Sequence, residues 1–165
     1  MTTLTHTMVG VAIGATLWHF NPSISSTVNL GDICLFSAVF SNLPDINMLY
    51  RNLLNHHKDI THYPIVYIFL MMIFLFLETT LGVDLFYLKY ILCLCAVHLF
   101  MDLFGVRAGL YLFMPFSTHE YSFTKLVKEQ DLNLRGIVHY SLKNGVLISE
   151  IFVVSFSVIL FSIFS

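Results

Sequence analysis

Charged side chains are scarce in this chain of 165 residues, and their scarcity argues against a water-soluble domain. Lys, Arg, Asp and Glu together make up 11% of the sequence, whereas hydrophobic residues make up 57%. A typical soluble domain carries about 25% charged residues. The formal net charge of -2 offers no basic surface to a nucleic acid, so no nucleic-acid partner is expected. The composition predicts a chain whose main solvent is lipid.

Cysteine is also rare, and the N-terminus has no basic stretch. The three cysteines, Cys34, Cys93 and Cys95, lie inside apolar runs and form no C-x-x-C pair. No disulfide framework is therefore implied, and we expect all three to be small buried residues. A secretory signal peptide would begin with basic residues. We expect the first residues, including His6, to remain in the mature protein.

Long apolar segments are what the sequence has in abundance. Five occur, at residues 6–20, 30–50, 63–83, 85–104 and 146–164. The third is the clearest membrane span, since a helix needs roughly 20 apolar residues to cross a bilayer. The first two are short, and Gly10 and Gly14 in the first allow close helix contact. The polar stretch 105–145 is expected to hold a short amphipathic or re-entrant helix.

These segments predict an all-α, polytopic membrane protein. Residues 1–165 are expected to form one membrane-embedded domain of about five helices, the first two forming a short hairpin. Seven of the eight basic residues lie in two loops, one after the second segment and one after the fourth. Two spans separate these loops, so they share a side, and the positive-inside rule makes that side cytoplasmic.

Potential metal ligands gather on the same side. All eight histidines except His19 fall there in this topology. His98 and Asp102 are four residues apart in an apolar span, so they share a helix face and could grip one ion. A charge at the bilayer centre costs about 2.5–3.5 kcal/mol, so Asp102 is expected to have a compensating partner. The alternative is a His–Asp hydrogen bond that pins two helices. Imidazole and carboxylate ligands suit zinc, manganese or iron.

An ordered set of short motifs carries a family resemblance. The motifs are Thr5-His6, Leu43-Pro44-Asp45-Ile46-Asn47, His57-Lys58-Asp59-Ile60-Thr61-His62-Tyr63, His98-Leu99-Phe100-Met101-Asp102, and later Gly109 and Pro115-Phe116. Together they resemble the YdjM-like family of small bacterial inner-membrane proteins, which are usually described as membrane-bound metal-dependent hydrolases. That family is distantly similar to the zinc phospholipases C and zinc nucleases.

The resemblance implies a ligand set and roles. It implies that five residues bind metal, with Asp102 able to bridge two ions: His6, Asp45, His57, His98 and Asp102. It gives catalytic roles to Asp45, which would orient the attacking water, and to His62, which would be a further ligand or would orient the water or the leaving group. Lys58 and Arg107 would contact a substrate phosphate.

The chain departs from the family pattern at several positions. Asn47 replaces the second Asp of L-P-D-x-D, Lys58 replaces an Arg, and Tyr63 replaces a Ser. The His-x-x-x-Glu pair of the secreted phospholipases is not present, because Lys143 stands four residues after His139. One or two ions are therefore expected rather than three.

The sequence thus predicts a multi-pass hydrolase of the bacterial inner membrane with its site on the cytoplasmic side. The expected cofactor is zinc, or alternatively manganese or iron, and the expected substrate is a phosphoester of a membrane lipid or lipid-linked molecule. Two alternatives stay open: a non-enzymatic membrane protein with a structural metal site, and a metal or proton transporter. Whether His56, His119 or His139 are ligands is also left open.

Overall fold

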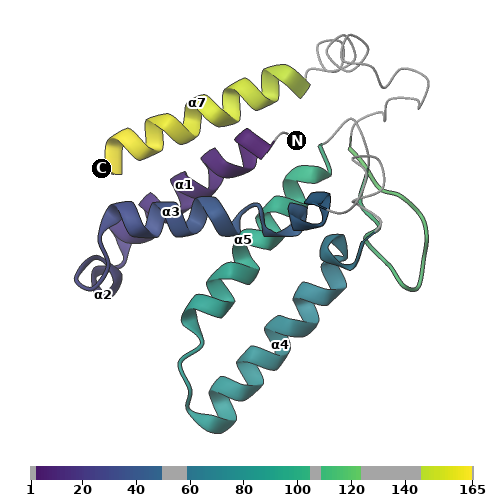
Figure 1. Cartoon of the computed structure of the whole chain (residues 1–165), viewed down its shortest axis with the longest axis horizontal. Helices are drawn as coiled ribbons and strands as arrows, with labels where there is room; N and C mark the ends of the chain where they lie inside the picture. Colours follow the sequence, from purple (N-terminus) through teal and green to yellow (C-terminus); the bar gives the residue numbers. More distant parts are fainter. Residues whose placement is uncertain (1–2, 50–58, 105–108, 124–145, 165) are drawn as a thin grey trace.

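The computed structural model describes residues 3–49, 59–104, 109–123 and 146–164. Within these ranges the chain is all-α, with no strand beyond an isolated bridge between Leu110 and Tyr121. The elements are α1 (Thr3–Phe20), α2 (Pro22–Ser25), α3 (Leu30–Phe40), the 3-10 helices η1 (Leu43–Leu49) and η3 (Ile60–His62), α4 (Pro64–Leu81), α5 (Phe86–Asp102) and α7 (Val146–Phe164) (Figure 1). The predicted helical class is confirmed, and each of the five apolar segments contains a helix.

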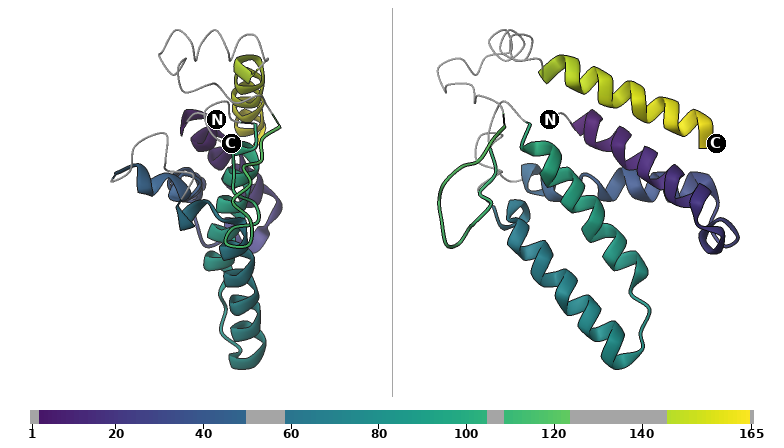
Figure 2. Two further views of the ribbon diagram at one scale, coloured as in Figure 1. Left: turned by 90° about the vertical axis from the view of Figure 1, so that its right-hand side faces the viewer. Right: turned by 180° about the vertical axis from the view of Figure 1, so that it is seen from behind.

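The first two apolar segments form the predicted hairpin. Helices α1 and α3 pack against each other and are joined through the short α2, while α7 lies along the other side of α1 (Figures 1 and 2). A Cβ atom on Gly10 would lie 2.5 Å from Ser41 Oγ, and one on Gly14 would lie 2.7 Å from Ser37 Oγ. Only glycine leaves room for this approach, so the expected close helix contact is confirmed.

Local sequence explains where several helices begin and end. The Asn29 side chain accepts a hydrogen bond from the Asp32 N–H at 2.8 Å and caps α3. Pro64 stands in the first turn of α4, where a missing N–H costs little. Gly82 ends α4 in the left-handed conformation at φ 65°. These caps fix the positions at which the polar segments between the helices start.

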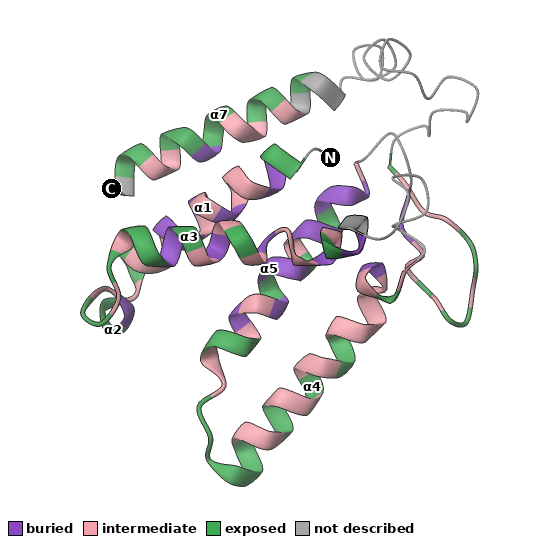
Figure 3. Cartoon of the chain, in the orientation of Figure 1, coloured by how far each residue is buried: buried purple, intermediate pink, exposed green. Residues whose placement is uncertain are grey.

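Helices α4 and α5 form a second hairpin that extends away from α1, α3 and α7 (Figures 1 and 2). Among the described helices, α4 is the one long and apolar enough to cross a membrane. It has no buried residue, and exposed and half-buried residues alternate along its whole length (Figure 3). Near the loop that joins α4 to α5, Lys89 of α5 forms an ion pair with Glu78 of α4. The positive charge of Lys89, which lies in an apolar helix, is thereby neutralised.

One expectation from the sequence needs correction, and a second is tested only over part of its range. Cys34 and Cys95 are buried as expected, but Cys93 is exposed. Within the polar stretch 105–145 the structure describes residues 109–123, which hold turns and the Leu110–Tyr121 bridge and no helix. The remainder of that stretch lies outside the described residues.

Candidate metal centre

Five polar side chains meet where the two hairpins join, and they come from four separate chain segments. His6 lies in α1, Asp45 in η1, His62 at the end of η3, and His98 and Asp102 in the last turns of α5. Four of them are almost fully enclosed, with exposed fractions of 2% for His6, 0% for His62, 1% for His98 and 2% for Asp102. Asp45 is the most accessible, with 13% of its side chain exposed.

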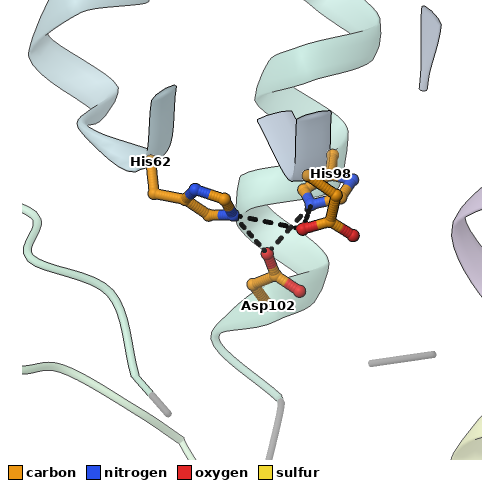
Figure 4. Close-up of side chains that lie close together, drawn as sticks. His62, His98 and Asp102 are labelled. Atoms are coloured by element: carbon orange, nitrogen blue, oxygen red, sulfur yellow. Dashed lines mark ion pairs between the residues drawn. The ribbon is translucent and has the colours of Figure 1, made fainter. Parts of the chain in front are cut away.

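Four of these residues point one ligand atom each at a common centre. The four atoms, from Asp45, His62, His98 and Asp102, all lie within 4.8 Å of one another. Asp102 Oδ2 is 3.1 Å from His98 Nε2 and 3.8 Å from His62 Nε2 (Figure 4). Asp45 Oδ1 is 3.3 Å from His62 Nε2 and 3.4 Å from His98 Nε2.

These separations suit a tetrahedral ion. Ligand atoms bound at 2.0–2.2 Å to a tetrahedral ion are themselves separated by about 3.3–3.6 Å. The four measured N–O separations run from 3.1 to 3.8 Å and bracket that range. The group could therefore hold a metal ion.

A backbone hydrogen bond fixes which nitrogen of His98 faces this centre. His98 Nδ1 lies 2.7 Å from the carbonyl oxygen of Ser41, and because a carbonyl only accepts, Nδ1 carries the proton. In the neutral ring Nε2 then holds a lone pair. Nε2 is buried, faces two carboxylates and forms no hydrogen bond of good geometry within the described residues. A lone pair facing carboxylate oxygens is repulsive unless a cation or a proton stands between them, which is the environment of a metal ligand.

The second carboxylate oxygen of Asp102, Oδ1, contacts His6. His6 Nε2 is 3.1 Å from Asp102 Oδ1, whereas His98 is near Oδ2. The His6 ring also stacks on the His98 ring, with centroids 3.8 Å apart. The two oxygens of one carboxylate thus face different sets of imidazoles, as in a carboxylate that bridges two positions.

Ser41, at the end of α3, forms hydrogen bonds with both α1 and α5. Its carbonyl accepts from His98, and its hydroxyl donates to the His6 carbonyl at 3.1 Å. Next to it, the Asn42 side chain donates to Thr7 Oγ1 at 2.9 Å. The end of α3 therefore positions the start of α1 and the end of α5, and with them His6 and His98.

The Asp45 carboxyl of the cluster favours its charged form. Burial alone raises the pKa of this carboxyl, but the imidazoles of His62 and His98, whose Nε2 atoms lie 3.3 Å and 3.4 Å from Asp45 Oδ1, outweigh burial and leave this pKa well below its usual range. Asp45 and Asp102 would then repel each other across a short distance. Imidazole neighbours reduce this repulsion, and a divalent ion at the centre would remove it.

The structure brings together most of the residues singled out from the sequence. His6, Asp45, His98 and Asp102 lie close together, and His62 lies inside the same group. His119 is described and lies apart from the cluster, against Tyr121. Sequence reasoning missed Ser41, which acts mainly through a backbone carbonyl and so leaves no side-chain signal. Other predicted or open positions lie outside the described residues, namely His56, His57, Lys58, Arg107 and His139.

The fold and the cluster define a class: a helical membrane protein with a buried imidazole–carboxylate group that could hold a metal ion. The whole chain, residues 1–165, matches the family described as YdjM inner membrane protein, and the chain belongs to that family. An inner-membrane location follows from that description, and α4 is the described helix that could span the membrane. Comparison with curated proteins gave no match. Comparison with solved structures gave none either.

Proposed function

We propose that this protein is a membrane-bound, metal-dependent hydrolase that acts on a phosphoester of a membrane lipid or lipid-linked molecule. The observation that carries the proposal is the group of four ligand atoms whose separations suit an ion, with His6 on the second oxygen of Asp102. The resemblance to metal-dependent hydrolases supports it as an analogy.

The membrane arrangement is part of the proposal. Besides α4, we place α1, α3, α5 and α7 in the membrane, because they are apolar and expose many large hydrophobic side chains. The cluster lies at one end of the α4–α5 hairpin, since His62 stands two residues before α4 and Asp102 ends α5. Seven of the eight basic residues adjoin these ends in the sequence, two of them before α4 and five after α5, so we place this side in the cytoplasm. A site at this level can be reached by a lipid head group.

The donor set fits zinc, with manganese or iron as alternatives, and holds one or two ions. Asp45, His62, His98 and Asp102 would hold the first, and His6 with the second oxygen of Asp102 would contribute to another. A bound divalent ion supplies a water of lowered pKa and polarises the scissile group.

Side chains of the protein would transfer the proton and bind the substrate. Asp45 is the most exposed member of the cluster, so it can face an incoming water and accept its proton. His62 packs beside it and orients either the water or the leaving group. Lys58 and Arg107 supply positive charge for the phosphate.

Two measurements on the purified full-length protein test this proposal. Elemental analysis gives the metal content, and mass spectrometry follows the cleavage of phosphatidylethanolamine and phosphatidylglycerol in vesicles. Wild type should contain about one or two transition-metal ions and release products. His98→Ala and Asp102→Ala should lose both properties, whereas His19→Ala, a histidine at the opposite end of α1, should retain both. Equal metal content in all four proteins would refute the proposal.

A structural metal site is the second candidate, because four protein ligands can close a tetrahedral ion. The variant Asp45→Asn separates the two. In a hydrolase it lowers turnover far more than thermal stability, because Asp45 is the most exposed member of the cluster and an amide of the same size fills its place. In a purely structural site it lowers stability, and wild type cleaves no lipid while holding its full complement of metal.

A further inference from the structure

An apolar groove runs between α4 and α5, on the far side of α5 from α1. It encloses about 480 Å³, within the range of about 300–1,000 Å³ typical of small-molecule sites. Its walls are almost wholly apolar and include Tyr67, Met71 and Met72 of α4 and Cys93, Ala96 and Phe100 of α5. Leu110 and Leu112, from the segment 109–123, close one end.

The groove has the length of one membrane leaflet. It follows α4 from Pro64 to Met72 and α5 from Leu92 to Leu103. At 1.5 Å per residue these stretches are about 12 Å and 16 Å long. Half of a bilayer's hydrocarbon core is about 15 Å thick. The groove therefore begins at the end of the hairpin that holds the cluster and has about the length of one leaflet's hydrocarbon layer.

The closed end of the groove adjoins the cluster. Leu99 and Leu103, which line it, directly follow His98 and Asp102. Across the groove, the Tyr67 hydroxyl donates to the Thr61 carbonyl at 2.6 Å, one residue before His62. The end of the groove marked by Leu99, Leu103 and Pro64 therefore lies at the same end of the hairpin as the cluster, although no cluster residue lines the groove itself.

We propose that this groove binds one acyl chain of a membrane phospholipid, with its head group at the cluster end. This assignment rests on the proposed function and names its substrate class. The side of the groove is bordered by exposed apolar residues, with Ile68 61%, Met72 57% and Phe100 59% exposed, so a chain can enter sideways from the surrounding lipid. An acyl chain in the groove contacts both α4 and α5, whereas an acyl chain on the outer face of α4 contacts that helix alone.

The experiment uses full-length protein in vesicles of phosphatidylethanolamine and phosphatidylglycerol. A trace of phosphatidylglycerol carries a photoreactive diazirine, either near the carboxyl end of one acyl chain or at its methyl end. After irradiation, mass spectrometry locates the labelled residues. The carboxyl-end probe should label Pro64 to Tyr67 and Leu103. The methyl-end probe should label Met72 and Cys93. Both probes should label groove residues more strongly than Phe69, which lies on the outer face of α4.

A variant pair isolates the groove from general lipid contact. Ala96 is exposed in the groove, so Ala96→Phe fills it without entering the protein core. Labelling of the groove residues should fall about tenfold, which corresponds to losing the burial of about two methylene groups. Val158→Phe places the same side chain on the exposed face of α7 and should leave labelling unchanged. Wild type alone gives the position-dependent labelling, so the test stands even if Ala96→Phe does not fold.

The outcomes separate this inference from the hydrolase proposal. Labelling that is equal on Phe69 and Met71, or insensitive to Ala96→Phe in a folded variant, would overturn the groove as a binding site, even with lipid cleavage intact. If the methyl-end probe labels Pro64 and Leu103 and the carboxyl-end probe labels Met72 and Cys93, the placement of the head group at the cluster end is overturned. The expected labelling in a protein that cleaves no phospholipid would support the groove and refute the hydrolase.

Discussion

Replacing Gly10 by alanine would place a methyl group inside the contact between α1 and α3. The new Cβ would lie 2.5 Å from Ser41 Oγ and 2.6 Å from the Ser37 carbonyl oxygen, where ordinary contact begins at 3.4 Å. Ser41 Oγ can rotate, but the Ser37 carbonyl belongs to the backbone of α3. The helices must therefore separate, and the bond from Ser41 to the His6 carbonyl is lost or lengthened.

The cost of Gly10→Ala follows from two opposing terms. Overpacking costs about 1–3 kcal/mol, and the upper end applies because a backbone atom is in the way. Alanine is about 1 kcal/mol better than glycine inside a helix, which offsets part of this cost. The net loss of about 2 kcal/mol should lower the unfolding midpoint by about 4–8 °C for a chain of this size.

Trp18, the chain's one tryptophan, is a suitable probe of this loss. It belongs to the same hairpin, and its Nε1 donates to the Val28 carbonyl at 2.9 Å. Thermal unfolding in detergent is followed by its fluorescence. The control Gly31→Ala adds the same methyl group to α3, where the one near atom is Asn29 Oδ1 at 3.3 Å, a side-chain atom that needs to move by only a few tenths of an ångström; this variant should unfold close to the wild-type temperature. If Gly10→Ala unfolds at the same temperature as Gly31→Ala, the reasoning from close packing is refuted.

Three further predictions concern other parts of the molecule. Tyr90→Phe should cost about 1 kcal/mol, because the buried Ser37 hydroxyl loses its 2.6 Å hydrogen bond with Tyr90 and keeps only the one to the Ile33 carbonyl, and an unchanged unfolding midpoint would contradict this. Removing divalent metal with a chelator should lower the unfolding midpoint of wild type, which is left with two adjacent carboxylates, but not that of His98→Ala; equal responses would argue against an ion at the cluster. Cysteines introduced by Asn55→Cys and Lys128→Cys should react with a membrane-impermeant maleimide only after the membrane is opened, and labelling in intact spheroplasts would reverse the proposed orientation.

Much of the fold could be predicted from the sequence because its determinants are local. Apolar runs, a proline and a capping asparagine mark the helices, and the spacing of Gly10 and Gly14 marks a close contact. Which face of a helix is covered depends on its neighbours. Cys93 and Cys95 point to different sides of α5, and only the arrangement of the helices decides that Cys95 is enclosed while Cys93 faces the open groove.

The cluster was predictable from residue type but not from contacts made by the backbone. His98 and Asp102 stand one helical turn apart, so their shared face follows from the sequence. The distance between His6 and Asp102 depends on how closely α1 approaches α5, which no local pattern contains. The hydrogen bond from His98 to the Ser41 carbonyl is of the same kind, because every residue has a carbonyl and the sequence does not distinguish one from another.

The position of Ser41 also has a consequence for biogenesis. His6 and Asp102 are in contact although nearly 100 residues separate them in the sequence. The Ser41 carbonyl likewise accepts its hydrogen bond from His98 only once α5 has been made and has packed beside α3. At about 5–20 residues per second, the roughly 100 residues between His6 and Asp102 take about 5–20 s to synthesise. During that interval His6 and the Ser41 carbonyl are without their partners on α5. The cluster can therefore be complete only after about the first 100 residues have been synthesised, whatever ion it holds.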